Sequence, residues 1–308
     1  MTLDRSPSAV GQFSLLDSYD NFLLMCRQVL SLSRAKVKRS HLSSNLLTAP
    51  LKARQVVTLP LNLLNHLQIA PSYSGPPIEV LFENNDLMAI SKPYNLHSHP
   101  LNYLEYDNCL SWLRCSDPKN SKQVLQICSS SMERGLLNRL DFVTSGVLIL
   151  IKHEKLHQAL RNNFSLMVKE KIYLAIVEGE LVNQGDQCHY FLSSGPKGRK
   201  VKVSSVNTAG AKEGWLALSL LKYDSLTNRS LVKVRLLSGL RHQIRAQLAF
   251  LGHPIVGDTL YGGIADPNSS RVFLHSYCYR LQLPDGEIEL KDATASLFGA
   301  LFNMDGIF

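Results

Sequence analysis

The sequence predicts an α+β fold, because strand and helix signals are mixed along most of the chain. Short apolar runs rich in branched residues and bounded by Gly, Pro or Asn indicate strands, whereas apolar residues spaced three to four apart indicate helices. The chain has 308 residues, of which 45% are hydrophobic and 19% are charged. This length and composition are sufficient for one large buried core or two smaller ones.

Four segments carry the strand signals. "IEVLFENNDLMAISKP" at 78–93 predicts two short strands around an Asn-Asn-Asp turn. "GVLILIK" at 146–152 is short, continuous and branched, which is typical of a strand buried on both faces. "KEKIYLAIVEGEL" at 169–181 and "SLVKVRLL" at 230–237 predict two more strands.

Helix signals follow two of these strands. "HEKLHQALRNNF" at 153–164 is amphipathic, with leucines and a phenylalanine four residues apart. "RHQIRAQLAFLGHP" at 241–254 has an apolar stripe and is expected to end at Gly252 and Pro254.

The first part of the chain differs in composition from the rest. No acidic residue occurs between Arg34 and Arg54, and the basic residues of this run are Arg34, Lys36, Lys38, Arg39, Lys52 and Arg54. "PSYSGPP" at 71–77 has the composition of a linker. We therefore predict a basic extension with a linker at 1–77 and a separate domain at 78–308. The unmixed sign of the basic run favours RNA contact over a solvated helix face.

Charge and cysteine content restrict the class of protein. Lys and Arg total 33 against 25 Asp and Glu, and the resulting net charge of +8 favours a polyanionic partner, although a basic protein without such a partner fits equally well. The six cysteines form no C-x-x-C pair, which indicates reduced thiols. No signal-peptide pattern and no membrane-length apolar run occur, so we expect a soluble cytoplasmic protein without a membrane partner.

Asp141 is the first candidate for chemistry. In "LLNRLDFVTSGVLILIK", residues 136–152, this carboxylate and Arg139 precede a nearly unbroken apolar run. Taken alone, an aspartate before Thr-Ser-Gly is most simply a turn residue that caps the following backbone N–H groups. A carboxylate at the end of a rigid buried strand is also well placed for catalysis in a water-poor pocket.

"SGLRHQIRAQL", residues 238–248, supplies basic groups. Arg241, His242 and Arg245 are predicted in the first turns of a helix, with the two arginines on one face. Like charges at this spacing are favourable only beside an anion, such as a phosphate or the Asp141 carboxylate.

Two further segments add candidates for ligand contact. Tyr173 shares its strand face with the small Ala175, which leaves room for a planar ligand to stack, although plain packing is the usual role of a strand tyrosine. "SKPYNLHSHP" at 91–100 places Lys92 in a Lys-Pro turn and Asn95 where a positive φ is tolerated, so this loop can approach a ligand closely.

"HEKLH" at 153–157 matches the H-E-x-x-H pattern of zinc proteases. A catalytic zinc site needs a third protein ligand, and no candidate follows at a recognised spacing. A solvated helix face explains the match without a metal, so a zinc hydrolase is the weakest of the alternatives.

Together these segments resemble the pseudouridine synthases of the RluA type, from about Ile78 to about Phe298. "LLNRLDFVTSGVLILIK" is similar to the family's H-R-L-D-x-x-T-S-G segment, whose catalytic Asp falls on Asp141. "KEKIYLAIVEG" is similar to the strand that bears the active-site tyrosine, here Tyr173. "LLSGLRHQIRAQLAFLGHPIVGDTLYGG" is similar to the segment whose arginine partners the catalytic Asp, here Arg245.

The sequence departs from the family pattern at three positions. Asn138 stands where a His is usual, Asn95 stands for a Gly after Lys-Pro-x, and Leu240 replaces an arginine, with Arg241 next to it. These changes concern contacts around the site and leave the three central residues in place.

The resemblance implies a mixed, largely antiparallel sheet flanked by helices and loops, and an RNA pseudouridine synthase acting on specific uridines of ribosomal or transfer RNA. Asp141 would be the nucleophile or the stabiliser of the sugar cation, Arg245 its partner, and Tyr173 the stacking group. The RNA-contacting residues would be Arg139, Arg241, His242, Lys92 and Asn138. It implies no metal and no cofactor, and we expect a monomer. Many relatives carry an S4 RNA-binding domain, so the resemblance implies a degenerate S4-like segment within residues 1–77 and a catalytic domain at 78–308. An inactive RNA-binding protein of the same fold is the main alternative.

Overall fold

The structure is a computed structural model that describes residues 10–15, 17–30, 32–34, 37, 44–60, 69–129, 131–192, 200–267, 269–295, 298 and 302. The chain folds as two compact units, each with its own core. The first unit comprises Met1–Gly75 and His99–Arg134, and the second comprises Pro76–Ser98 and Gly135–Phe308. The boundary after Gly75 falls inside the predicted linker.

The first unit contains β1 (Val10–Ser14), α1 (Phe22–Gln28), α3 (Ser44–Thr48), β2 (Val56–Pro60), α4 (Cys109–Ser116) and α5 (Pro118–Val124). β1 and β2 form an antiparallel pair. Helix α1 begins after Asn21, whose side chain accepts a 2.8 Å hydrogen bond from the backbone N–H of Leu24, as an N-cap does.

Residues 99–134, which the sequence prediction assigned to the catalytic domain, pack instead with the N-terminal residues. Tyr103 and Tyr106 are buried in one cluster with Phe22, Met25 and Leu59. Of the basic run, Arg34, Lys52 and Arg54 are exposed, while Lys36, Lys38 and Arg39 lie outside the described residues.

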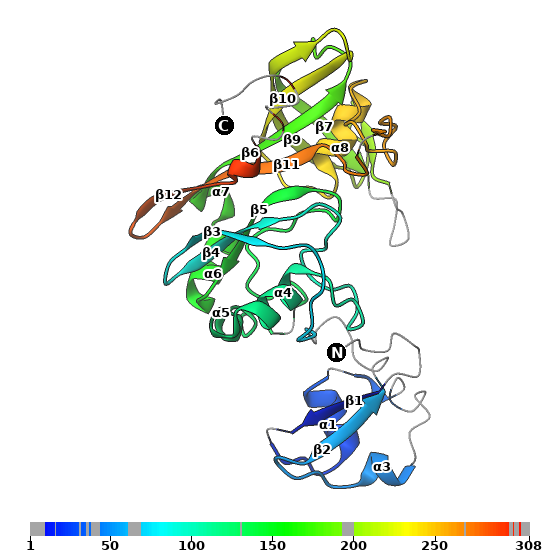
Figure 1. Cartoon of the computed structure of the whole chain (residues 1–308), viewed down its shortest axis with the longest axis vertical. Coiled ribbons are helices and arrows are strands. Elements are labelled where there is room, and N and C mark those ends of the chain that lie inside the picture. Colours follow the sequence, from blue (N-terminus) through cyan, green and yellow to red (C-terminus); the bar gives the residue numbers. More distant parts are fainter. Residues whose placement is uncertain are drawn as a thin grey trace. The chain divides into compact units, whose positions relative to one another are not determined.

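The second unit is built on one large sheet (Figure 1). Its strands are β3 (Glu79–Glu83), β4 (Leu87–Lys92), β5 (Ser145–Ile151), β6 (Val168–Glu178), β7 (Gly185–Leu192), β8 (Lys202–Ser204), β9 (Lys212–Asp224), β10 (Arg229–Leu236), β11 (Leu274–Leu283) and β12 (Gly286–Lys291). Their spatial order is β3-β4-β5-β11-β6-β10-β9-β7-β8, and β12 pairs with β11. Only the pairing of β5 with β11 is parallel among the described strands, so the predicted mixed, largely antiparallel sheet is confirmed.

Each strand segment predicted from the sequence forms a strand. β5 is buried at all seven of its residues, which explains its unbroken apolar run. The turn between β3 and β4 is held by Asn84, whose side chain accepts hydrogen bonds from the backbone N–H groups of Asp86 and Leu87. Asn95 has a φ of 55°, a conformation that the sequence indicated this position would tolerate.

Among the described residues, the second unit also contains α6 (Glu154–Asn162), α7 (Phe164–Met167), α8 (Gln243–Phe250) and the 3-10 turn η2 (Ala293–Ala295). The α8 side chains Gln243 and Gln247 donate hydrogen bonds to backbone carbonyls of β9, at Trp215 and Gly214 respectively. These bonds fix α8 against the sheet (Figure 1). No described helix is both long and apolar enough to cross a bilayer.

The start of α8 differs from the prediction. The helix begins at Gln243, because His242 has a φ of 53° and its left-handed backbone cannot continue helical hydrogen bonding. Arg241 therefore lies in the turn before the helix and does not share a helical face with Arg245.

Candidate active site

Asp141 lies in the turn that leads into β5. The backbone N–H of Thr144 donates to the Asp141 carbonyl at 3.0 Å, which closes the turn. The Asp141 side chain is 28% exposed, and its Oδ2 accepts a 3.2 Å hydrogen bond from Nη1 of Arg245. The carboxylate thus faces a cation across 104 residues of sequence and does not serve as a simple turn cap.

Arg245 is held between two carboxylates. Its Nε and Nη2 donate to Oδ2 and Oδ1 of Asp258 at 2.7 and 2.8 Å, and its Nη1 remains for Asp141. Burial disfavours the guanidinium charge, but the two carboxylates outweigh this effect and raise the pKa of Arg245. A bidentate pair of this kind fixes the plane of the guanidinium, so Asp258 orients the group that orients Asp141.

His242 approaches the same carboxylate from the turn before α8. Its Nε2 is 3.9 Å from Oδ2 of Asp141, and its Nδ1 is 2.9 Å from the hydroxyl of Tyr261. The Tyr261 oxygen also accepts from the backbone N–H of Val201, so this hydroxyl connects His242 to the segment before β8. Burial lowers the pKa of His242, and the Asp141 charge opposes this shift while Arg245 and Arg241 add to it.

Tyr173 projects from β6 and is 6% exposed. Its hydroxyl lies 3.1 Å from that of Tyr279 on β11. Burial raises the pKa of Tyr173, and the charge of Asp141 raises it further, while hydrogen bonds with Tyr279 and Ser276 oppose the rise. Tyr173 is therefore a neutral phenol within electrostatic reach of Asp141.

Two of the predicted RNA contacts are corrected by the structure. Lys92 is fully buried, and its ammonium donates to the backbone carbonyls of Pro93 and Leu96 at 2.8 and 2.7 Å and lies 3.4 Å from that of Phe142. Asn138 is also buried, and its amide pairs with the backbone of β5 at Val147 and Ile149. Both side chains shape the loops around Asp141 and have no surface to offer RNA.

Arg139 and Arg241 are exposed, as an RNA contact requires, so they remain predicted contacts. The residues that sequence reasoning did not single out are Asp258, Tyr261 and Tyr279. Asp258 and Tyr261 both lie in "GHPIVGDTLYGG", shortly after α8, and their places in this family-like segment were the available signal.

Buried polar side chains lie behind Ser145, the first residue of β5. Ser145 Oγ is 2.9 Å from Nδ1 of His275, and Nε2 of His275 is 3.6 Å from Oδ2 of the fully buried Asp292. Burial lowers the pKa of His275 to about 4, with Asp292 opposing and Arg271 assisting the shift.

This shift predicts a specific acid sensitivity. His275 is neutral in the folded protein down to about pH 4 but takes up a proton near pH 6.5 when unfolded, so stability should fall as the pH drops through this window. The free energy of unfolding should fall by up to about 3 kcal/mol. Urea titrations at a series of pH values measure this loss, and His275→Gln should not show it. His153→Gln, at an exposed histidine, is the matched control. An unchanged acid limb in His275→Gln would contradict the assignment.

The two histidines of "HEKLH" do not face a common point for a metal. His153 is the residue before α6, and its Nε2 is 3.0 Å from the carbonyl of Asn85. His157 is buried, and its Nε2 is 3.1 Å from the carbonyl of Leu136. A ring nitrogen beside a carbonyl oxygen carries a proton and is not a ligand. Among the described residues, no group of three His, Cys, Asp or Glu side chains is arranged to hold a metal ion.

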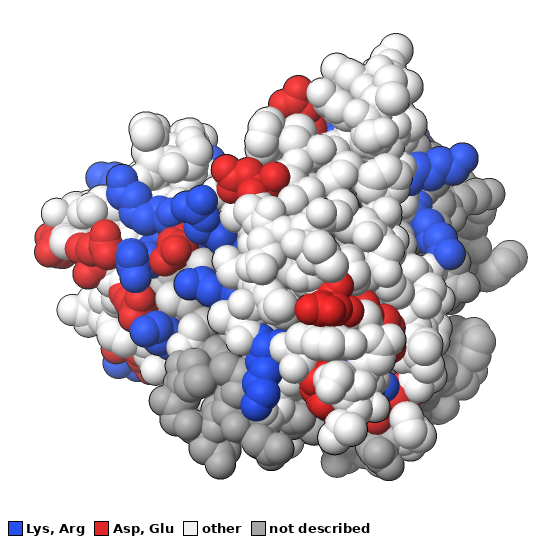
Figure 2. Space-filling view, turned by 90° about the horizontal axis from the view of Figure 1, so that it is seen from above, with Lys and Arg blue, Asp and Glu red and all other residues white. Residues whose placement is uncertain are grey.

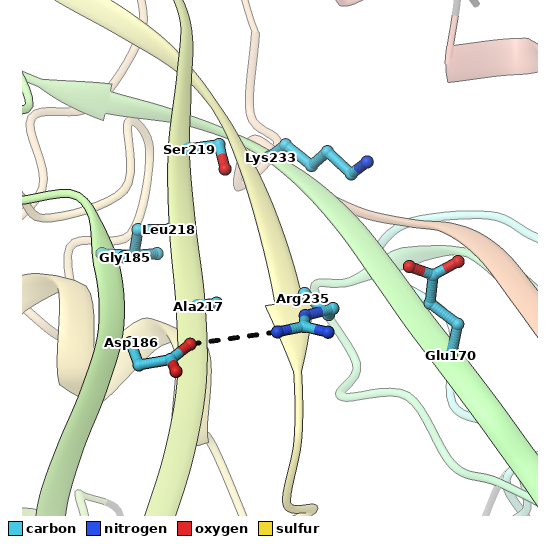
Figure 3. A pocket seen from close by; sticks show the side chains of 8 residues that line it. All are labelled: Glu170, Gly185, Asp186, Ala217, Leu218, Ser219, Lys233 and Arg235. Atoms are coloured by element: carbon cyan, nitrogen blue, oxygen red, sulfur yellow. Dashed lines mark ion pairs between the residues drawn. The ribbon is translucent and has the colours of Figure 1, made fainter.

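A charged hollow of about 360 Å³ lies elsewhere on the sheet (Figure 3). Lys233 and Arg235 flank Val234, which pairs with Tyr173, so they point to the opposite face of the sheet from the tyrosine. Glu170 and Asp186 balance these cations, and Arg235 lies 3.9 Å from Asp186. The hollow is therefore neither part of the Asp141 site nor strongly attractive to a polyanion.

On the left of the face seen in Figure 2, Lys and Arg side chains lie among those of Asp and Glu. Arg280 illustrates this mixing, because it pairs with Glu170, Glu287 and Glu289 at 3.5, 3.3 and 2.8 Å. The individual cations near Asp141 therefore say more about where RNA would bind than the net charge of the chain does.

The fold and the site define the class of protein. The solved structure of human RNA pseudouridylate synthase domain containing 1 is similar to this chain, with a TM-score of 0.57 and 20% identity over 71% of this chain and 84% of that one. This likeness shows the pseudouridine synthase fold.

The sequence comparisons identify the family. Residues 86–250 match the RNA pseudouridylate synthase family, and the chain belongs to it, as the sequence predicted. An uncharacterized RNA pseudouridine synthase of Helicobacter pylori is 28% identical over 70% of this chain. The ribosomal large subunit pseudouridine synthase D of Borreliella burgdorferi is 28% identical over 71% of it. The matches cover 65% and 64% of the lengths of these two relatives.

Proposed function

We propose that this chain isomerises specific uridines of structured RNA to pseudouridine, with Asp141 as the essential carboxylate. The observation that carries the proposal is the Asp141 side chain, which is partly exposed and paired with an arginine that a second carboxylate holds in place. Membership of the family and the name of the Borreliella relative favour ribosomal RNA as the first substrate to test, with transfer RNA as the second.

The proposed reaction breaks the bond between C1′ of the ribose and N1 of uracil and forms a bond between C1′ and C5. The ionised Asp141 adds to the substrate or stabilises the sugar cation, the detached uracil rotates, and C5 loses its proton after the new bond forms. Since N1 gains a proton, the overall change is an isomerisation that consumes no other reactant. The uridine must first leave the base stack, which costs a few kcal/mol.

The other residues of the site have supporting roles in this proposal. Arg245 keeps the carboxylate oriented, and Asp258 is a positioning residue because it acts through Arg245. His242 lies within reach of Asp141 and of a substrate bound there. Tyr173 stacks on the uracil. Its hydroxyl takes the proton that leaves C5 while giving its own proton on toward solvent, so no phenolate forms, and N1 takes a proton from solvent in return.

Tyr173→Phe tests the relay separately from the stacking. The ring is retained, so RNA affinity should stay near that of the wild type, while turnover should fall by about 10²–10⁴ if the hydroxyl moves a proton. Tyr279→Phe is the matched control, because it breaks the same hydroxyl pair from the other side. Equal losses of turnover in the two variants would show that only the hydrogen bond between them matters.

The function itself is tested by mapping pseudouridines in ribosomal and transfer RNA from cells with and without this protein. The proposal predicts at least one uridine whose modification disappears without the protein and returns with the purified chain. If the protein binds RNA but no position changes, the chain is an inactive RNA-binding protein of this fold.

A further inference from the structure

Arg271 has an unusual environment close to the Asp141 turn. Its guanidinium carbon lies 4.9 Å from the ring centroids of both Tyr94 and Phe298, and 5.3 Å from that of Phe273. Its Nη2 donates a 2.9 Å hydrogen bond to Ser145 Oγ. The side chain is thus fixed in direction by three aromatic rings and one hydroxyl.

The charge of Arg271 is not balanced by a direct ion pair. Among the described residues, no carboxylate lies within 4.0 Å of the guanidinium, and Ser145 Oγ is the single acceptor for its five N–H groups. Its Nε is buried and has no hydrogen-bond partner. Partial burial of an unpaired cation is unfavourable, and it lowers the pKa of Arg271.

The position of this cation relates it to the proposed site. Ser145, which holds Arg271, is the first residue of β5 and lies four residues after Asp141. Tyr94 stacks on the guanidinium and belongs to the loop that follows β4. The Lys92 ammonium connects this loop to the Asp141 turn, because it donates to the backbone carbonyls of Leu96 and Phe142. Tyr94 is 39% exposed, so the cluster reaches solvent on its side.

We infer that Arg271 is a phosphate-binding residue that receives one phosphodiester of the RNA strand beside the nucleotide that enters the Asp141 site. This inference rests on the proposed function. A guanidinium offers only donors, in a fork that matches two phosphate oxygens, and phosphate contacts position RNA without reading its sequence. The bound phosphate supplies the anion that the protein itself does not place against Arg271, and Tyr94 forms the rim of this phosphate site.

A purely structural role is the competing explanation. Arg271 connects through Ser145 and His275 to the buried Asp292, and its aromatic contacts tie Phe298 to the rest of the unit. Such a role predicts a loss of stability on substitution but no specific change in the ionic part of RNA binding. The two explanations therefore separate in a salt titration.

The first test compares RNA binding by Arg271→Gln, Arg271→Lys and Arg280→Gln, each in the Asp141→Asn background so that the RNA is not altered during the measurement. The probe is the ribosomal RNA fragment that carries the mapped uridine or, where mapping finds none, the fragment bound most tightly. Arg271→Gln should weaken binding roughly tenfold to a hundredfold and make the slope of log K against log salt shallower by about 0.7–0.9. Arg271→Lys should restore most of the slope, and Arg280→Gln, at an exposed arginine already paired with glutamates, should leave it unchanged.

A second test locates the phosphate. Each linkage around the target uridine is replaced in turn by an uncharged methylphosphonate. The protein with Arg271 intact should lose the most affinity when one particular linkage is made uncharged. The Arg271→Gln variant should bind the RNA modified at that linkage as tightly as it binds the unmodified RNA. An unchanged salt slope in a folded Arg271→Gln, or equal losses at every linkage, would overturn the inference.

The result is independent of turnover. If the wild type modifies uridines and Arg271→Gln keeps the full salt dependence of RNA binding, the phosphate site is refuted and the proposed function stands. If the wild type modifies no RNA but Arg271→Gln lowers the salt dependence of RNA binding, the proposed function is refuted and the phosphate site stands.

Discussion

Asp141→Asn should abolish pseudouridine formation, with turnover lowered by a factor of at least about 10⁴, while the fold and RNA affinity remain close to those of the wild type. The amide keeps the shape of the side chain and can still accept a hydrogen bond from Arg245. It has no negative charge, however, so it neither attacks the nucleotide effectively nor stabilises a sugar cation. Single-turnover assays, RNA binding and melting temperature together separate these effects.

The alternative interpretation of Asp141 as a turn residue predicts a different outcome. Loss of a turn contact would cost about 1 kcal/mol of stability and leave turnover largely intact. Asp117→Asn is a suitable control, because the Asp117 side chain accepts a hydrogen bond from the backbone of Asn120 at the start of α5. Similar behaviour of the two variants would remove the reason for assigning chemistry to Asp141.

Arg245→Met should have the second largest effect, on both activity and stability. It removes the partner that orients Asp141, and it leaves the Asp258 carboxylate, whose side chain is 1% exposed, without its two charge-assisted hydrogen bonds. Breaking one side of a buried ion pair costs about 3–5 kcal/mol. Urea unfolding and turnover should therefore both be severely impaired.

The two losses can be separated with a double variant. Arg245→Met with Asp258→Leu replaces the buried pair by apolar groups and should recover much of the stability, because the unpaired buried charge is gone. It should not recover turnover, because Asp141 still lacks its cation. Arg245→Lys should be intermediate, since an ammonium keeps the charge but cannot bridge both carboxylates in the same geometry. Recovery of turnover in the double variant would show that Arg245 acts only through stability.

The strands were predictable because their sequence signals are local. The pairing of Asp141 with Arg245 was predictable because both residues lie in motifs that occur in the same order as in the family. The unbroken apolar run of β5 indicates a strand buried on both faces, and the family segments place Asp141 and Arg245 together although 104 residues separate them. Asn95 stands where the family has a Gly, and Asn is one of the few other residues that tolerate the positive φ observed there.

The errors have a common physical origin, because each depends on contacts between distant segments. The left-handed backbone of His242 accompanies its contact with Tyr261, which no local propensity encodes. Lys92 looks like a surface cation in sequence, but three carbonyl groups converge on its ammonium in the folded chain. Residues 99–134 join the first unit because Tyr103 finds its buried neighbours in the N-terminal segment.

The most direct test of the central claim is release of tritium to water from uracil-5-labelled ribosomal and transfer RNA transcripts, measured with the wild-type protein and with Asp141→Asn. We expect the wild type to release tritium in proportion to the pseudouridine formed, and the variant to release none above background at equal RNA occupancy. Release by Asp141→Asn at a rate near that of the wild type, or none by a wild-type protein that binds these RNAs, would contradict the account.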